Sequence, residues 1–184
     1  MKQKILTTLD AYFKKHKQAS NDDSLKHCIE VAHHILKKSK YCFLNSQGKN
    51  GWCSSRLIEP IIERDNNGSF TIWIGTRKDL RKVEEIWENP KVSVTFENLR
   101  EKANIVIYGN AFIETNPEIK RKNWKGAWKT IFLADPKSNE YIALRIEPSR
   151  IKIVNLNKNI TPEPFDLKPA VLVNHQDQWK KEKV

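Results

Sequence analysis

Apolar residues recur at spacings of three and four along the first forty residues, as they do on one face of a helix. Residues 5–13 carry one such stripe and residues 25–36 carry a second. Asn21-Asp22-Asp23-Ser24 separates the two stripes and supplies side chains that cap helix N-termini. The pattern predicts a helical extension over residues 1–40.

From Tyr41 onward, short apolar runs alternate with polar residues between turn-forming clusters, which is typical of strands. Six strands are expected, the last of which can also be a strand pair: residues 41–45, 52–58, 70–74, 92–96, 104–114 and 141–155. Residues 46–51 and 65–68 have turn compositions, the second because Asn and Gly tolerate positive φ. Gly109, inside a long strand, indicates a β-bulge.

Two further helices are expected among the strands. Residues 80–88 form a short helix that Asn89-Pro90 ends, and Pro117 opens a helix that runs to about Phe132. Trp124 and Trp128 then lie one helical turn apart, a spacing that favours core packing or a subunit contact.

Strands that follow one another through hairpin turns favour an antiparallel sheet, and about six of them close a small barrel. A parallel sheet would need crossover helices between most strands, and the pattern lacks them. We therefore expect an α+β protein of one domain, consistent with its 184 residues. Its parts are a helical extension (residues 1–40), an antiparallel six-stranded barrel (residues 41–155) and an extended tail on or beside the barrel (residues 156–184).

The chain carries 33 basic and 22 acidic residues, a formal charge of +11, so an anionic partner is expected. Its basic runs are scattered and form no recognisable nucleic-acid-binding module, so the pattern does not favour nucleic acid. The three cysteines cannot all pair, and no apolar run reaches signal or membrane length, which indicates a cytoplasmic protein. His27, Cys28 and His34 lack structural-zinc spacing, so no metal is expected.

The junction between the strand at 70–74 and the helix at 80–88 is the strongest candidate site. Gly75-Thr76 ends a buried strand and a basic turn follows, so backbone N–H groups, a hydroxyl and cations meet there, as in a phosphate site. If Asp79 caps the helix, Arg81 and Lys82 fall in its first turn. Cations are unfavourable at that end of a helix unless a negative group lies nearby.

That negative group is either a bound anion or a carboxylate of the chain itself. Glu84 and Glu85 follow on the same helix and would make it a solvated helix with ion pairs. Arg56, between apolar neighbours on the second strand, presents the same choice. It either recognises a phosphate with two hydrogen bonds or extends its stem to solvent from an edge strand.

The run Trp73-Ile74-Gly75-Thr76-Arg77-Lys78-Asp79-Leu80-Arg81-Lys82-Val83-Glu84-Glu85-Ile86-Trp87-Glu88-Asn89-Pro90-Lys91-Val92-Ser93-Val94 resembles the signature of the pyridoxamine 5′-phosphate oxidase-like split barrels. Together with Ala143-Leu144-Arg145-Ile146-Glu147-Pro148 it most resembles the general stress protein 26 subgroup. The resemblance covers residues 41–155. It implies an FMN-binding split β-barrel of Greek-key topology that forms a homodimer, with the flavin at the subunit interface.

The resemblance also implies which residues contact the flavin. Arg81 and Lys82 would hold its phosphate, and the other contacts would come from Arg56, Leu57, Ile58, Gly75, Thr76, Asn104 and Trp128. One position departs from the pattern, because Leu80 stands where the family has a serine, so one hydroxyl contact is missing.

No residue stands out as a general acid, base or nucleophile, which suits direct hydride or electron transfer. The family's Arg-x-His substrate motif is absent from residues 155–184, so true pyridoxamine-phosphate oxidation is not expected. The resemblance implies an FMN-dependent oxidoreductase that acts on an unknown small substrate. The alternative is a non-catalytic stress protein that binds flavin or haem.

Overall fold

The computed structural model describes residues 24–65, 69–132, 135–158, 160, 169–176 and 178–182. The helix expected at residues 5–13 and most of the turn expected at 65–68 lie outside the described residues. The helices are α2 (Leu25–Lys38), α3 (Arg81–Glu88), α4 (Pro117–Lys122) and α5 (Trp128–Phe132), with 3-10 turns at Leu99–Glu101 and Leu156–Lys158. The strands are β1 (Cys42–Gln47), β2 (Cys53–Ile58), β3 (Ile61–Arg64), β4 (Phe70–Arg77), β5 (Lys91–Asn98), β6 (Ala103–Glu114), β7 (Tyr141–Asn155), β8 (Ala170–His175) and β9 (Gln178–Lys181).

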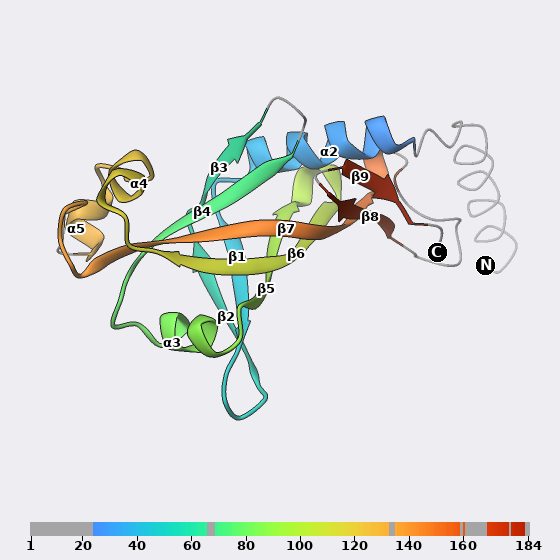
Figure 1. Cartoon of the computed structure of the whole chain (residues 1–184). Helices are drawn as coiled ribbons and strands as arrows, with labels where there is room; N and C mark the ends of the chain where they lie inside the picture. The colour runs from blue at the N-terminus through green and yellow to red at the C-terminus, as the bar shows by residue number, and fades with distance from the viewer. Residues whose placement is uncertain are drawn as a thin grey trace, which may run out of the picture.

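All the strands of the described residues belong to one antiparallel sheet in the order β2-β1-β5-β6-β7-β4-β3, with β8 paired to β7 and β9 paired to β8 (Figure 1). The α+β class and the antiparallel pairing are confirmed, but the described residues form nine strands instead of six. The three additional strands, β3, β8 and β9, have six residues or fewer. β3 and β9 have only four residues, too few for a clear alternation, and β8 and β9 lie in the segment that was expected to be an extended tail.

The predicted bulge at Gly109 is confirmed and bends the sheet. The pairing of β6 with β7 shifts register between Tyr108 and Gly109, and a Cβ at Gly109 would lie 2.2 Å from the carbonyl oxygen of Glu147. On one side of the bulge β7 pairs with β4, and on the other side it pairs with β8. The bulge therefore lets one long strand belong to both halves of the curved sheet.

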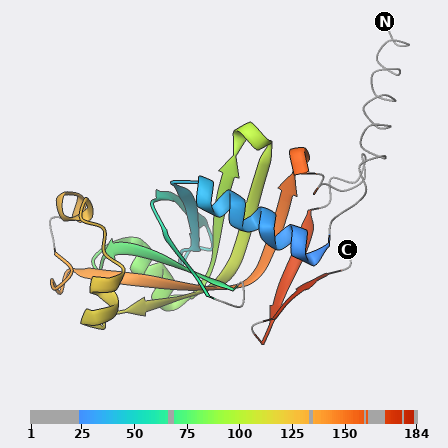
Figure 2. The same ribbon diagram turned by 90° about the horizontal axis from the view of Figure 1, so that it is seen from above.

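Helix α2 packs against the sheet and shares the core of the strands (Figure 2). Ser24 caps it by accepting a hydrogen bond from the backbone N–H of His27 at 3.3 Å, as the cap signal predicted. Its buried stripe is Cys28, Val31, Ala32, Ile35 and Leu36, and the hydrophobic core spans this stripe and the inner faces of the strands. No helix of the described residues is long and apolar enough to cross a membrane.

The single helix expected from Pro117 to Phe132 is wrong. Asn116 and Pro117 do begin a helix, but α4 ends at Lys122, and Trp128 begins a separate helix, α5. The intervening residues, with Gly126 among them, form turns, so Trp124 is not on a helix with Trp128. The two indoles meet edge to face instead, with ring centroids 6.1 Å apart.

Candidate functional site

The end of β4 and the first turn of α3 bring a lysine onto a buried threonine. Thr76 is fully buried, and Lys82 Nζ donates a hydrogen bond to its Oγ1 at 2.9 Å. Leu80 is the N-cap of α3 and contributes no side-chain hydrogen bond. The predicted cap, Asp79, is wrong, because its carboxylate accepts two hydrogen bonds from Arg77 instead.

Arg56 on β2 is anchored beside this pair by a buried carboxylate. Its Nη2 donates to Glu85 Oε2 at 2.7 Å, and its Nη1 donates to Ser46 Oγ at 2.6 Å. Ser46 in turn donates to Glu85 Oε2 at 2.5 Å. The three side chains form a closed network. Arg56 and Ser46 both donate to Glu85 Oε2, and Arg56 also donates to the Ser46 hydroxyl.

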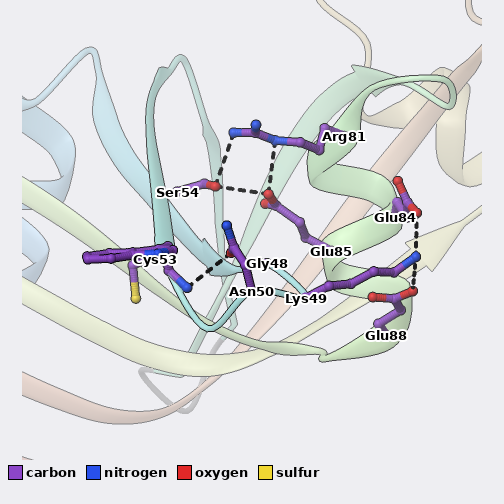
Figure 3. Close-up of a pocket in the computed structure, with 10 residues that line it drawn as sticks. Gly48, Lys49, Asn50, Cys53, Ser54, Arg81, Glu84, Glu85 and Glu88 are labelled. Carbon is purple, nitrogen blue, oxygen red and sulfur yellow. Dashed lines mark hydrogen bonds and ion pairs between the residues drawn. The ribbon is translucent and has the colours of Figure 1, made fainter.

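The second oxygen of Glu85 is occupied from the solvent side (Figure 3). Ser54 donates to Oε1 at 2.9 Å, and Arg81 Nε lies 3.1 Å from the same oxygen. Arg81 also donates from Nη2 to Ser54 Oγ at 3.2 Å, although 77% of its side chain is exposed. One carboxylate, 5% exposed, therefore engages the guanidinium groups of both Arg56 and Arg81.

The environment of the site shifts two pKa values. Burial, and then the positive charge of Arg56, lower the pKa of Lys82 to about 8. Burial alone would raise the pKa of Glu85, but hydrogen bonds from Ser46, Arg56 and Ser54 lower it to about 2. Glu85 is therefore ionised at neutral pH, whereas no ion pair joins Lys82 to a carboxylate of the described residues.

Arg81 and Glu85 line a cavity of about 530 Å³ between the β1–β2 turn and α3, whereas Arg56 and Lys82 are not part of its lining (Figure 3). Its polar wall includes Ser54, Arg81 and Glu85 on one side. On the other side Lys49 bridges Glu84 and Glu88, with 2.8 Å between its Nζ and each carboxylate. The cavity thus opens beside Arg81 and Glu85.

Gly75 and Trp128 form a second group on the opposite face of β4. Successive strand residues face opposite sides, so Gly75 points away from the side that Thr76 faces. Trp128 is 2% exposed and its ring covers Gly75, since a Cβ there would lie 2.3 Å from Cζ3. Phe132 and Tyr141 pack on the same indole at centroid distances of 5.6 Å and 6.4 Å. In this chain Trp128 is therefore a core side chain.

Asn104 is not brought to this cluster within one chain. Arg56 is paired in register with Leu44, Leu44 with Val94, and Val94 with Ile107, and directly paired residues share a face. Asn104 lies three positions from Ile107 on β6 and is exposed, so it faces the other side of the sheet.

The other two predicted residues of β2 differ in exposure. Leu57 is 59% exposed and lies opposite Phe43, which is 40% exposed, so the two form an outward apolar pair. Ile58 is half-buried and packs against the core.

Sequence reasoning missed Ser46 and Ser54, and it named Glu85 only as a partner in solvated ion pairs. Its pairing with Arg81 at i,i+4 is present, but the carboxylate is buried and also engages Arg56 from another strand. Ser46 was assigned to a turn, yet β1 continues to Gln47 and the turn begins at Gly48. The spacing of Arg81 and Glu85 was the available signal, but it did not reveal that the Glu85 carboxylate is buried.

Comparisons with known proteins identify a family and a fold for this chain. Residues 27–159 match the family described as pyridoxamine 5′-phosphate oxidase like. The search of curated proteins found no match. Among solved structures, the general stress protein 26 from Bacillus anthracis str. Sterne is similar, with a TM-score of 0.60 and 22% identity over 70% of this chain and 94% of that chain.

Two further solved structures share the fold. A protein related to general stress protein 26 of the pyridoxinephosphate oxidase family, from Clostridium acetobutylicum, has a TM-score of 0.61 and 17% identity over 70% of this chain and 89% of that chain. A pyridoxamine 5′-phosphate oxidase-related, FMN binding protein from Nostoc punctiforme PCC 73102 has a TM-score of 0.59 and 11% identity over 87% and 96%. At these identities the likeness shows the fold alone, an antiparallel split barrel.

Proposed function

Because the chain belongs to the pyridoxamine 5′-phosphate oxidase-like family, we propose that it is a flavoprotein that binds FMN and carries out redox chemistry on a small substrate. One structural observation carries the proposal. Lys82 is a half-buried cation beside the cationic Arg56, and among the described residues it bonds to the hydroxyl of Thr76 and to no carboxylate. Two neighbouring cations, of which one lacks a carboxylate partner in the described residues, favour an anion, and the phosphate of FMN would supply it. The FMN-binding description of the Nostoc punctiforme neighbour supports this choice of ligand.

The residues present fit the phosphate end of such a cofactor. Lys82 and Arg56, together with the exposed Arg81, would neutralise the phosphate, and Thr76 would hold the Lys82 ammonium in place. When bound, the flavin would supply the hydride or electron transfer, and the protein would supply position and charge. The missing serine at Leu80 leaves the N-terminus of α3 without a side-chain cap. A phosphate there would be bound by backbone N–H groups instead of a hydroxyl.

We also propose that the active form is a homodimer with the flavin at the subunit interface. The exposed apolar pair Phe43 and Leu57 supports it, because exposed side chains of this kind on a sheet face mark contact surfaces. Asn104 is exposed on the outer side of the sheet, from where it would reach a neighbouring subunit. Light scattering of the purified chain and of Leu57→Lys checks the assembly, and a wild-type monomer would contradict it.

A cytoplasmic location belongs to the same proposal. The sequence has three cysteines, and their spacing suggests no disulfide framework. Thiols that stay reduced suit a reducing compartment.

The visible spectrum of the purified protein, followed by titration with FMN and with riboflavin, tests the cofactor. We expect near-stoichiometric FMN and weaker binding of riboflavin, which lacks the phosphate. Lys82→Gln should lose most of that preference, whereas Lys78→Gln, on an exposed lysine paired with Glu140, should keep it. A colourless protein that ignores added FMN would refute the proposal.

The second candidate function is a carrier that holds flavin or haem without turnover. The sequence shows no evident general acid, base or nucleophile, which favours a carrier over a hydrolytic enzyme. The same observation does not distinguish a carrier from a redox enzyme. A Soret band in the same spectrum would identify haem. Oxidation of a nicotinamide donor with an artificial acceptor would distinguish an enzyme from a carrier.

A further inference from the structure

The buried carboxylate of Glu85 has no role in the phosphate-binding pattern, yet it determines the charge of the site. It lies on the same helix as Arg81 and Lys82, the two cations that the resemblance assigns to the phosphate, and it is 5% exposed. All four hydrogen-bonding contacts that reach it come from side chains around the proposed site: Ser46, Ser54, Arg56 and Arg81.

The three cations of the site therefore have different partners. Arg56 and Arg81 each place a guanidinium nitrogen on Glu85, at 2.7 Å and 3.1 Å. Lys82 places its ammonium on Thr76 and on no carboxylate of the described chain. Three cations with one carboxylate leave two positive charges, and a phosphate monoester carries about −1.5 to −2 near pH 7.

We propose that Glu85 is a built-in counter-anion that positions Arg56 and Arg81 and restrains the attraction of the site for phosphate. This inference rests on the proposed function, because it concerns the same phosphate site. Glu85 stays on the two arginines when the ligand is bound, and the phosphate is held chiefly by Lys82 and by the remaining N–H groups of Arg56. Glu85 is a positioning residue, and its charge opposes the ligand that it helps to orient.

The variant Glu85→Gln isolates the charge. A glutamine can keep its carbonyl oxygen toward Arg56 and turn its amide toward Ser54, whose hydroxyl can accept a hydrogen bond. The amide then faces the Nε donor of Arg81, which is exposed and can turn into solvent. The substitution removes one negative charge while keeping the length of the side chain. Glu84→Gln is the matched control, because Glu84 is the neighbouring residue of α3, is exposed and pairs with Lys49.

The measurement is the ratio of the affinities for FMN and riboflavin, obtained by fluorescence titration of each variant. The ratio reports on the phosphate alone, so a general weakening of the fold cancels. We expect Glu85→Gln to raise the ratio about tenfold or more, the effect of one unit charge a few ångströms away at the effective dielectric of a protein surface. Glu84→Gln should leave it within a factor of two or so.

The outcomes separate this inference from the proposed function. If the wild type binds FMN no better than riboflavin, the phosphate site itself is wrong. If the wild type prefers FMN and Glu85→Gln has an equal or lower ratio, or if Glu84→Gln raises the ratio equally, only the role of Glu85 is overturned.

A crystal structure of the wild-type protein with FMN tests the inference even if Glu85→Gln does not fold. We expect the Glu85 carboxylate to remain within hydrogen-bonding distance of Arg56, with the phosphate contacting Lys82. A phosphate that takes both arginines and leaves Glu85 turned away would overturn the proposal.

Discussion

Replacing Gly75 by alanine distinguishes a packing role from a cofactor role for this residue. The added Cβ would lie 2.3, 2.5 and 2.9 Å from Cζ3, Cε3 and Cη2 of Trp128. Ordinary contacts lie between 3.4 and 4 Å, so the indole must retreat by roughly an ångström. Trp128 is 2% exposed and surrounded by aromatic rings, so it has no room to do so.

The magnitude follows from two opposing terms. Overpacking a filled core costs about 1–3 kcal/mol, whereas Gly→Ala at a compatible backbone position stabilises by about 0.4–1 kcal/mol. Gly75 has no positive φ, so the second term applies. We expect the free energy of unfolding to fall by about 2 kcal/mol, because contacts as short as 2.3 Å place the overpacking toward its upper range.

Equilibrium unfolding in urea measures the change, with Gly126→Ala as the control, because its Cβ would meet nothing within 4 Å. Trp128→Leu makes room for the added methyl group. The free energy of unfolding lost in the double variant, Gly75→Ala with Trp128→Leu, should therefore be smaller than the sum of the two single losses by about 1–2 kcal/mol. If Gly75→Ala is as stable as Gly126→Ala, the packing argument is refuted. Unchanged stability with lost FMN binding would assign Gly75 to the cofactor.

Three further predictions concern pH and the sheet. The preference for FMN over riboflavin should fall as the pH rises through about 8, where Lys82 loses its proton, and Lys82→Arg should retain the preference at pH 9. Glu85 has a folded pKa of about 2 against an ordinary 4.5, so its contribution to stability, roughly 3 kcal/mol, is complete above pH 4.5 and is lost as the pH falls toward 2. Urea unfolding at pH 6, 4 and 3 measures this loss, which should be missing in Glu85→Gln. If the free energy of unfolding of the variant falls as steeply with pH as that of the wild type, the loss does not come from Glu85. Gly109→Ala should destabilise by about 3 kcal/mol, because its Cβ would lie 2.2 Å from a backbone oxygen that cannot move without breaking the bulge, and an unchanged midpoint would show that the bulge relaxes.

The sequence by itself determined the local elements and their chemistry. Alternation and turn residues determined the antiparallel strands, since a period of two places one face in the core wherever the chain pairs. The sequence also predicted the cap at Ser24, the helix start at Pro117 and the bulge at Gly109. Each of these features depends on one residue and its immediate neighbours. The spacing of Arg81 and Lys82 after Gly75-Thr76 located the candidate site for the same reason.

Only the tertiary structure decided which of these residues meet. The strand order places Arg56 from β2 against Glu85 from α3, 29 positions apart, and turns Asn104 to the other face. It also places the Trp128 ring on Gly75. The partners of a buried charge depend on which residues the fold brings close together. The sequence therefore indicated Glu85 as an ion-pair partner but did not reveal that its carboxylate is buried. Because it is buried, the Glu85 carboxylate is paired with Arg56 and Arg81 and not solvated as an exposed glutamate would be.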